Sequence, residues 1–487
     1  MQSLHKIRRS MIFGSLLTAG LGNTVLAQKT DATQHEKETA PIRLEPLIEK
    51  AIATRNFKNK RRKLATEKLY LTNAYKPVWT SGLSWFDYTD VAHSLMGESA
   101  NEGLLPVHYL PAHLGVLPSL ATLPPTALAE ADVALSDGFA AFLDDLIDGR
   151  IPGTENTEKS ERKEPAFYAD QALRSGNIEH WVRLHGPNNR QYVALREAMQ
   201  RLESDDPKRL LLAINMERWR KDQEYFAAQK LVKINLPTFH LETWNGFLPL
   251  FDMPVVVGKP GRPTPVLPFD QITSLKFSPD WGVPATIERE DIIPILQKKP
   301  EIFEKMGLEV LKDGKHINAH EVDWNRVDPE HNVYSFRQPP GKENALGGVR
   351  FSLTNKFDIY LHDSPDRTKF SEPERAFSSG CVRVGNAEKL ATWIMDKNHN
   401  WNRKRVRTLM DSGKTHIQRL EQAVDVTFTY YSAWAKPDNT ILYGRDIYGF
   451  DQAIADKIDF GQSLSHPELT WSPPQQTSEE DSPILTP

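Results

Sequence analysis

The sequence predicts an α+β fold in which an α-helical domain precedes a mainly-β domain. Up to about residue 229, apolar residues recur at spacings of three and four, which is typical of amphipathic helices. From about residue 230, apolar and polar residues alternate and β-branched types become common, as they do in strands. A helical stretch, "EREDIIPILQKKPEIFEKMGLEVLKDG", interrupts the β part and indicates an insertion.

Composition limits the class of protein. The chain has 487 residues, a formal charge of −4, a pI near 6.5 and a mean hydropathy of −0.51. This length suggests about two to four domains. A nucleic-acid-binding protein would carry a basic excess, so we expect no nucleic-acid partner.

The N-terminus predicts export. Three basic residues in "MQSLHKIRRS" precede the short apolar run "MIFGSLLTAGLG", and the small residues Val25 and Ala27 occupy the two positions that a signal peptidase recognises. We therefore expect a signal peptide at residues 1–27 and a polar, disordered segment at 28–43. An uncleaved membrane anchor is the alternative, but the apolar run is short for a spanning helix of about 20 residues.

The helical domain is predicted at residues 44–229. "LEPLIEKAIATR" and "RRKLATEKLYLTNAY" have the spacing of amphipathic helices. A charged loop, "TENTEKSERKEP", interrupts the helical pattern, which resumes in "QYVALREAMQRLES" and "PKRLLLAINMERWRKDQEY".

The mainly-β domain is predicted at residues 230–455. "KLVKINLPTFHLETW" and "LPLFDMPVVVG" have strand patterns, and "GKPGRPTP" is a turn. "NALGGVRFSLTNKFDIYLHDS" predicts two strands around "TNK", "NAEKLATWIMD" predicts a helix, and "VDVTFTYYSAWAKPDNTILYGRDIYGFD" predicts a hairpin around "KPDN". The tail at 456–487 is rich in Pro, Ser and Glu and is expected to be disordered.

The chain has one cysteine, Cys381, within "SSGCVRV". A single cysteine cannot form an internal disulfide, and a free thiol in an oxidising compartment must be buried or used. An inert, buried cysteine is one interpretation. A metal site is a poor one, because one thiol and one imidazole leave two ligands unnamed, and Asp363 and Asp366 are hard donors mismatched to a thiol.

Nucleophilic catalysis is the third interpretation. His362, nineteen residues before the cysteine, is expected at the end of the strand "FDIYL", where it can serve as a base. The backbone N–H groups of Gly380 and Cys381 can form an oxyanion hole. Arg383 shares the face of the thiol on a strand, where it can lower the thiol pKa or hold a substrate carboxylate.

"YLHDSP", a spaced arginine and "SSGCVRV" together resemble the active-site signature of the L,D-transpeptidases, whose catalytic domain is also called YkuD-like. Further segments resemble the large periplasmic branch of that family typified by YcbB: "NMERWR", "NLPTFHLE", "VVVGKPGRPTP", "QPPGKENALGGVRF" and "DIYGFD". The resemblance covers about residues 44–455.

The resemblance implies a helical scaffold, a β-sandwich catalytic domain, a capping subdomain at about 288–343, and no metal or organic cofactor. It implies that Cys381 attacks the carbonyl of meso-diaminopimelate at position three of a donor tetrapeptide. D-alanine leaves, and an acceptor amine resolves the thioester. His362 would be general base and then acid, oriented by a backbone carbonyl as is usual in the family. The other site residues expected are Gly380 for the oxyanion, and Tyr360, Ser379, Arg383 and Asn344 for the substrate. Arg383 can equally fix the turn by bonding backbone carbonyls.

One departure from the family concerns the wall-binding module. Large members of this branch carry a peptidoglycan-binding module before "NMERWR", and here only "AMQRLESDDPKRLLLAI" occupies that place. The cross-link type, 3→3 or 1→3, therefore stays open.

The family implies peptidoglycan stem peptides as partners, carbapenem-type β-lactams as covalent inhibitors and a periplasmic location. A glycosyltransferase or carboxypeptidase partner is left open. Three alternatives remain: an L,D-carboxypeptidase or endopeptidase, an enzyme attaching a protein to the wall, and an inactive wall-binding protein. Loss of the cysteine or histidine would have favoured the last.

Overall fold

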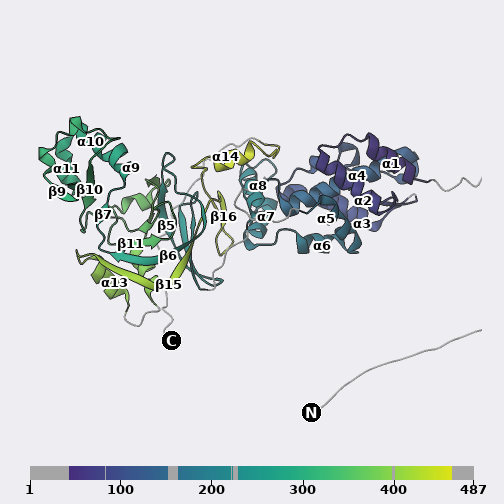
Figure 1. Ribbon diagram of the computed structural model, residues 1–487. Helices are drawn as coiled ribbons and strands as arrows, with labels where there is room; N and C mark the ends of the chain where they lie inside the picture. The colour runs from purple at the N-terminus through teal and green to yellow at the C-terminus, as the bar shows by residue number, and fades with distance from the viewer. Residues whose placement is uncertain are drawn as a thin grey trace, which may run out of the picture. The chain divides into compact units, whose positions relative to one another are not determined.

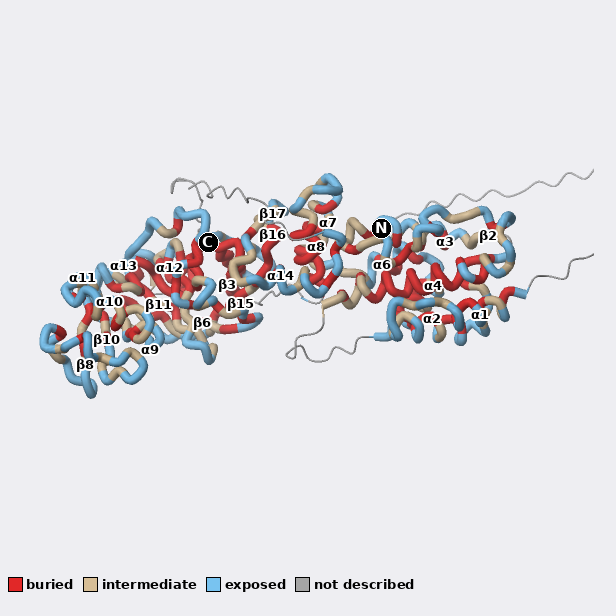
Figure 2. The backbone as a smooth tube through the Cα atoms, turned by 90° about the horizontal axis from the view of Figure 1, so that it is seen from above, coloured by how far each residue is buried: buried red, intermediate tan, exposed pale blue. Residues whose placement is uncertain are grey.

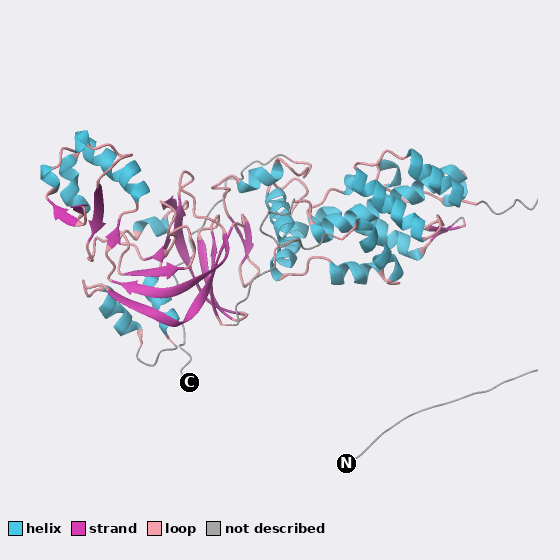
Figure 3. Cartoon of the chain, viewed as in Figure 1, coloured by secondary structure: helices cyan, strands magenta, loops and turns pink. Residues whose placement is uncertain are grey.

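The computed structural model describes residues 43–82, 84–151, 163–220, 222, 229–396 and 401–462. The predicted signal peptide, the segment 28–42 and the residues after 462 lie outside this range. Within it, no helix combines the length and the apolar character needed to cross a membrane. The helical and mainly-β parts of the predicted α+β fold are both present (Figures 1 and 3).

The helical part is organised around α4, which is long and mostly buried (Figure 2). Helices α1, α2, α3 and α5 pack against it. The α-helices of this part are α1 (Glu45–Thr54), α2 (Lys60–Thr72), α3 (Asp87–Gly97), α4 (Pro125–Asp148), α5 (Pro165–Arg174), α6 (Ile178–His185), α7 (Arg190–Arg201) and α8 (Lys208–Trp219). A short hairpin, β1 (Thr80–Ser81) and β2 (Ser84–Trp85), lies between α2 and α3.

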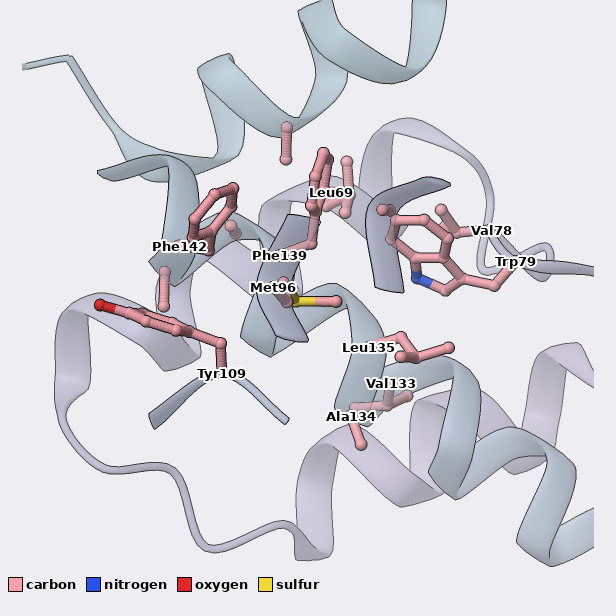
Figure 4. Close-up of a cluster of buried hydrophobic side chains, with 14 of the residues drawn as sticks. Leu69, Val78, Trp79, Met96, Tyr109, Val133, Ala134, Leu135, Phe139 and Phe142 are labelled. Atoms are coloured by element: carbon pink, nitrogen blue, oxygen red, sulfur yellow. The ribbon is translucent and has the colours of Figure 1, made fainter. Parts of the chain in front are cut away.

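Aliphatic and aromatic side chains together fill the core of this helical part (Figure 4). The rings of Trp79 and Phe139 meet edge to face, with centroids 5.4 Å apart. Buried Asp132 on α4 accepts hydrogen bonds of 2.9 Å from the backbone N–H groups of Val78 and Trp79. The carboxylate thus satisfies a buried loop and holds it against the helix.

The mainly-β part is built on a nine-stranded mixed sheet in the order β13-β5-β14-β12-β11-β6-β15-β3-β4. Strand β4 also pairs with β5, so the β-sandwich expected from the resemblance takes the form of one sheet that bends back on itself. Its strands are β3 (Lys230–Asn235), β4 (His240–Asn245), β5 (Leu248–Gly258), β6 (Leu267–Phe277), β11 (Val349–Leu353), β12 (Leu361–His362), β13 (Ala376–Ser378), β14 (Val382–Val384) and β15 (His416–Thr429). Helices α12 (Ala387–Met395) and α13 (Arg403–Met410) contribute to the same core.

The insertion forms a subdomain with its own core. Its four strands, in the order β7-β10-β8-β9, are β7 (Trp281–Gly282), β10 (Tyr334–Gln338), β8 (Glu309–Lys312) and β9 (Lys315–Ile317). Its α-helices are α9 (Ala285–Ile287), α10 (Ile293–Lys298) and α11 (Phe303–Met306), and a π-helical turn, Glu288–Ile292, joins α9 to α10. We call residues 281–338 the inserted subdomain.

The inserted subdomain begins earlier than the predicted residue 288. Trp281 and Gly282 pair with Gln338 and Arg337, so this strand pair closes its neck. Trp324 is buried and stacks near Phe336, which assigns this tryptophan to packing within the subdomain.

The last described elements are β16 (Ala433–Ala435), β17 (Ile441–Tyr443) and α14 (Phe450–Ala455). The predicted hairpin around "KPDN" is present, and its Ala435 exchanges two hydrogen bonds of 2.8 Å with the side chain of Gln191 on α7. The disordered tail does not begin at residue 456 as predicted. Ile458 and Phe460 are buried in the core formed around α7 and α8, because two apolar side chains in a polar stretch suffice to dock it.

Candidate active site

Three neighbouring strands bring the predicted catalytic residues together. His362 on β12 is in register with Arg350 on β11 and with Arg383 on β14. Cys381 immediately precedes β14, where the N–H of Val382 donates to the carbonyl oxygen of Tyr360 at 3.1 Å. Paired residues on adjacent strands share a face, and so do residues two apart on one strand. Arg350, His362 and Arg383 therefore lie on one face. Tyr360 directly precedes β12, its ring centroid lies 5.8 Å from that of His362, and its hydroxyl interacts with Cys381.

The strand that carries the histidine is shorter than predicted. Only Leu361 and His362 of "FDIYLH" are in the sheet, and the preceding residues run as a loop. Asp358 in this loop has a φ of +53°, which the alternating sequence pattern could not reveal.

His362 is buried, with 5% of its surface exposed. Its Nδ1 donates a hydrogen bond of 2.6 Å to the backbone carbonyl of Asp363. That bond keeps the ring proton on Nδ1 and leaves Nε2 to accept a proton from a nucleophile. Burial, then the charge of Arg383 and then that of Arg350, lower the pKa of His362 to about 3, against the opposing effect of the Asp363 carbonyl. The imidazole is therefore neutral at physiological pH.

The orienting group is thus a backbone carbonyl, as the resemblance implied, and not the Asp363 carboxylate. That carboxylate accepts a hydrogen bond of 2.8 Å from the N–H of Gly348 and pairs with Arg367. It is engaged on the other side of the chain and cannot complete a Cys–His–Asp triad.

Cys381 is partly exposed, and its Sγ lies 3.8 Å from the carbonyl oxygen of Asp358. Burial of the sulfur raises the pKa of the Cys381 thiol, while hydrogen bonding to Tyr360 acts in the opposite direction. No hydrogen bond joins Sγ to the ring of His362 in the part of the chain that the structure describes. The resting site therefore holds a neutral thiol and a neutral imidazole, with no preformed ion pair.

Tyr360, the predicted substrate-contacting residue, lies beside His362. Its ring centroid is 5.8 Å from that of His362, and the guanidinium carbon of Arg350 is 4.4 Å from the same tyrosine ring. Burial, then the charge of a Cys381 thiolate, raise the pKa of the Tyr360 hydroxyl, so this group stays protonated and can donate.

The turn before the nucleophile depends on Gly380 and Ser378. Gly380 has a φ of +113°, and a Cβ there would lie 3.2 Å from Ile359 Cδ1. Ser378 Oγ accepts a hydrogen bond of 3.2 Å from the Gly380 N–H and donates one to the Cys381 carbonyl. The Gly380 N–H predicted to bind an oxyanion is therefore occupied at rest, because Ser378 is its acceptor. The Cys381 N–H makes no hydrogen bond to any described residue and is the open donor.

The predicted turn "GKPGRPTP" holds the catalytic turn through hydrogen bonds. Lys259 N–H donates to the Ser378 carbonyl at 2.9 Å, and Thr264 Oγ donates to the Gly380 carbonyl at 2.7 Å. Thr264 Oγ also accepts from the Gly258 N–H at 2.8 Å. Sequence reasoning missed Ser378 and Thr264 as supporting residues, although both lie in segments that carry the family resemblance.

Ser379 connects the catalytic turn to the inserted subdomain. Its Oγ accepts a hydrogen bond of 2.9 Å from Arg262, and the same guanidinium pairs with Glu290 and Asp291 of the inserted subdomain. Ser379, predicted to contact substrate, is thus already bound by Arg262, which sequence reasoning also missed.

The two remaining residues predicted to contact substrate, Asn344 and Arg383, differ in where their side chains lie. Asn344 does not face the site: it is 2% exposed, its amide donates to the carbonyls of Gln338 and Pro339, and its Oδ1 accepts from Leu346 N–H. Its side chain is fully used in closing the loop that leaves the inserted subdomain, which corrects the prediction of a substrate contact. Arg383, by contrast, faces the site and donates no hydrogen bond to a backbone carbonyl within the described ranges, so the alternative turn-fixing role is not seen.

No cluster of three or more His, Cys, Asp or Glu side chains is placed to hold a metal ion among the residues that the structure describes.

Family models match both the helical and the mainly-β part of the chain. Residues 229–409 match the family model of the L,D-transpeptidase catalytic domain, YkuD, and residues 64–199 match that of a scaffold domain. A "Putative L,D-transpeptidase" of Haemophilus influenzae is 30% identical over 244 residues, which are 50% of this chain and 48% of that protein. The chain thus spans about half the length of this curated relative.

Two solved structures are also similar in part. An L,D-transpeptidase from Mycobacterium smegmatis is 13% identical, with 41% of this chain and 58% of that chain covered and a TM-score of 0.20. Mycobacterium tuberculosis L,D-transpeptidase 1 is 12% identical, with 41% and 60% covered and a TM-score of 0.16. His362 and Cys381 both fall inside the matched residues 229–409. Residues 229–409 are thus similar to the L,D-transpeptidase catalytic domain of the YkuD family, and residues 64–199 to a scaffold domain.

Proposed function

We propose that this protein is a cysteine-dependent peptidoglycan L,D-transpeptidase that acts in the periplasm. The observation that carries the proposal is that the sole cysteine directly precedes β14, which pairs with the strand of His362, and that Nδ1 of this histidine is fixed by the Asp363 carbonyl. The export signal predicted at residues 1–27 supports the location.

The chemistry follows from these groups. Cys381 Sγ attacks the carbonyl of meso-diaminopimelate at position three of a donor stem peptide, and His362 Nε2 takes the thiol proton. The Cys381 N–H is placed to bind the resulting oxyanion. The bond to D-alanine breaks, His362 returns the proton to the leaving amine, and a thioester remains. An acceptor amine then attacks the thioester, which forms the cross-link and regenerates the thiol.

The acceptor decides the product. An amine on the third residue of a second stem gives a 3→3 link, and one on the first residue gives a 1→3 link. Residues 202–207 alone connect α7 to α8, which leaves no room for a wall-binding module there and favours neither link. Water as acceptor would make the protein a carboxypeptidase or endopeptidase, and a protein amine would make it an attachment enzyme.

Mass spectrometry of muropeptides tests the proposal. The chain without residues 1–27, and its Cys381→Ala variant, would be incubated with purified disaccharide peptides and with intact sacculi. Dimers that depend on Cys381 are expected, and their fragmentation assigns 3→3 or 1→3. Trimmed monomers without dimers would identify the hydrolytic alternative, and no product from either substrate would contradict an autonomous cross-linking enzyme. A carbapenem is expected to add covalently to Cys381 and not to the alanine variant.

A further inference from the structure

A row of positive charge flanks the catalytic base. Arg350, His362 and Arg383 occupy three adjacent strands in direct register, and the charges of both arginines act on the imidazole. The guanidinium of Arg350 also lies 4.4 Å from the ring centroid of Tyr360, whose backbone pairs next to Cys381. Both cations are therefore close to the reacting atoms.

Neither arginine has a carboxylate partner among the described residues. The Nε atoms of Arg350 and Arg383 are buried without a hydrogen-bond acceptor. Their neighbours differ: Arg262 pairs with two carboxylates and Arg367 with one. Two partly buried guanidinium groups without an anion are costly, because desolvation is not offset by a partner.

The acids nearest to this row are already engaged. The carboxylate of Asp363 binds the Gly348 N–H and Arg367. Asp366 attracts Arg383 through its charge, but its carboxylate accepts two hydrogen bonds from Thr368 and forms no ion pair with the arginine. The protein thus leaves two cations open beside its nucleophile.

We propose that Arg350 and Arg383 together bind a carboxylate of the donor stem peptide beside Cys381. A guanidinium donates two parallel hydrogen bonds to a carboxylate, and it does so more strongly than a neutral donor. The donor tetrapeptide of the proposed function has two free carboxylates near the bond that breaks: that of the terminal D-alanine and that on the side chain of diaminopimelate. The identity of the ligand rests on the proposed function, whereas the presence of a carboxylate site does not.

Binding of such an anion also has a consequence for the base. A proton on His362 is disfavoured while two uncompensated cations flank it. A carboxylate between them reduces that repulsion when the imidazole takes the proton of the thiol. The donor therefore supplies part of the electrostatic support for its own acylation.

Alkylation of the single cysteine tests the site without any peptidoglycan. The rates with anionic iodoacetate and neutral iodoacetamide would be measured in the full chain and in Arg350→Met and Arg383→Met. The iodoacetate rate divided by the iodoacetamide rate is expected to fall by roughly tenfold in each variant, because each variant loses one charge-assisted contact. Arg407→Met, which removes an exposed arginine paired with Glu388 and Asp411, is the matched control and should leave the ratio unchanged.

The iodoacetamide rate shows whether each variant keeps a folded, accessible thiol. Arg350→Lys and Arg383→Lys retain charge without the forked donors, and they are expected to recover the ratio only in part. An unchanged ratio in both methionine variants, or full recovery by lysine, would overturn the carboxylate site.

The natural ligand is tested separately with donor tetrapeptides. One is amidated at the terminal D-alanine and the other at the side-chain carboxylate of diaminopimelate, and the one bound by the arginines is expected to lose kcat/KM roughly tenfold when amidated. Equal activity of both amides and the free acid would overturn the donor assignment. Absence of any cross-linking with an intact alkylation preference would instead contradict the proposed function alone.

Discussion

Titration of Cys381 in the free enzyme is expected to show one inflection above the ordinary pKa of a cysteine, with no thiolate held by His362 at neutral pH. Burial raises the pKa of the thiol, and the pKa of His362 is lowered to about 3. A thiol of ordinary pKa is about 3% ionised at pH 7, so Cys381 should be ionised less than that. A histidine of pKa about 3 is protonated in roughly one molecule in ten thousand at pH 7. The thiolate–imidazolium pair is therefore a minor state.

The assay uses the fact that the chain has one cysteine. The ultraviolet absorbance of the thiolate, taken as the difference between the wild type and Cys381→Ala, would be followed from about pH 4 to about pH 10. The rate of iodoacetamide alkylation over the same range provides an independent measure. Both should rise about tenfold per pH unit from neutral pH until the thiol ionises. His362→Gln is expected to leave this titration largely unchanged while abolishing acylation by a donor peptide.

A different result would refute the reasoning. A thiolate signal that is already complete below pH 7, and that disappears in His362→Gln, would show a preformed ion pair of the kind that cysteine proteases use. In that case the flanking arginines would not set the charge of the base, and the general-base mechanism would have to be replaced.

Three further predictions concern stability and the catalytic turn. The folded-state pKa of His362, about 3, lies below its unfolded value near 6.5, so its contribution to stability is complete above pH 6.5 and is lost as the pH falls toward 3. As the pH falls across that window, the free energy of unfolding measured in urea should decrease by about 1.4 kcal/mol less per pH unit in His362→Gln than in the wild type. Equal pH dependence of the two proteins would contradict the buried, neutral histidine. Thr264→Val removes the donor to the Gly380 carbonyl, and should cost about 1–3 kcal/mol and slow carbapenem acylation, whereas Thr264→Ser should restore both. Arg262→Met releases Ser379 from the inserted subdomain. The free energy of unfolding should change by less than about 1 kcal/mol, since its partners Glu290 and Asp291 are exposed and partly exposed, while intact-mass kinetics should show slower acylation. Unaltered acylation would mean that this contact does not hold the turn.

The sequence was most informative where the signal is local. The two-part α+β organisation follows from hydrophobic periodicity, and a small-residue turn leading into Cys381 can be recognised from consecutive letters. The position of Gly380 in that turn has a physical reason, because its φ of +113° excludes side chains. His362 was identified because it follows the strand pattern "FDIYL" and stands in "YLHDSP", a segment that resembles the family signature.

The features that the sequence did not reveal depend on pairing between distant segments. Arg350 lies beside His362 only because β11 and β12 pair in one register, and a shift by one residue would turn it to the other face. Thr264 reaches a turn more than a hundred residues later in the chain. Trp281 belongs to the inserted subdomain because it pairs with Gln338, a contact across the whole insertion. Local sequence patterns do not specify which distant segments pair, so the residues that surround and position the nucleophile could be identified only from the structure.

The electrostatics of the site bear on why a chain with one cysteine can leave it partly exposed. A thiolate is the form of cysteine that oxidants attack, and recovery from the sulfenic acid usually requires a second thiol, which this chain does not have. When no substrate is present, burial opposes ionisation of the Cys381 thiol more strongly than the charge of Arg350 favours it, and the cations beside His362 oppose protonation of the imidazole. If a donor carboxylate then binds between Arg350 and Arg383, the same cations become partners of the substrate and cease to oppose protonation of the base. The thiol would thus react mainly when a donor is bound. In the free enzyme its low reactivity would protect the only cysteine of the chain from oxidation.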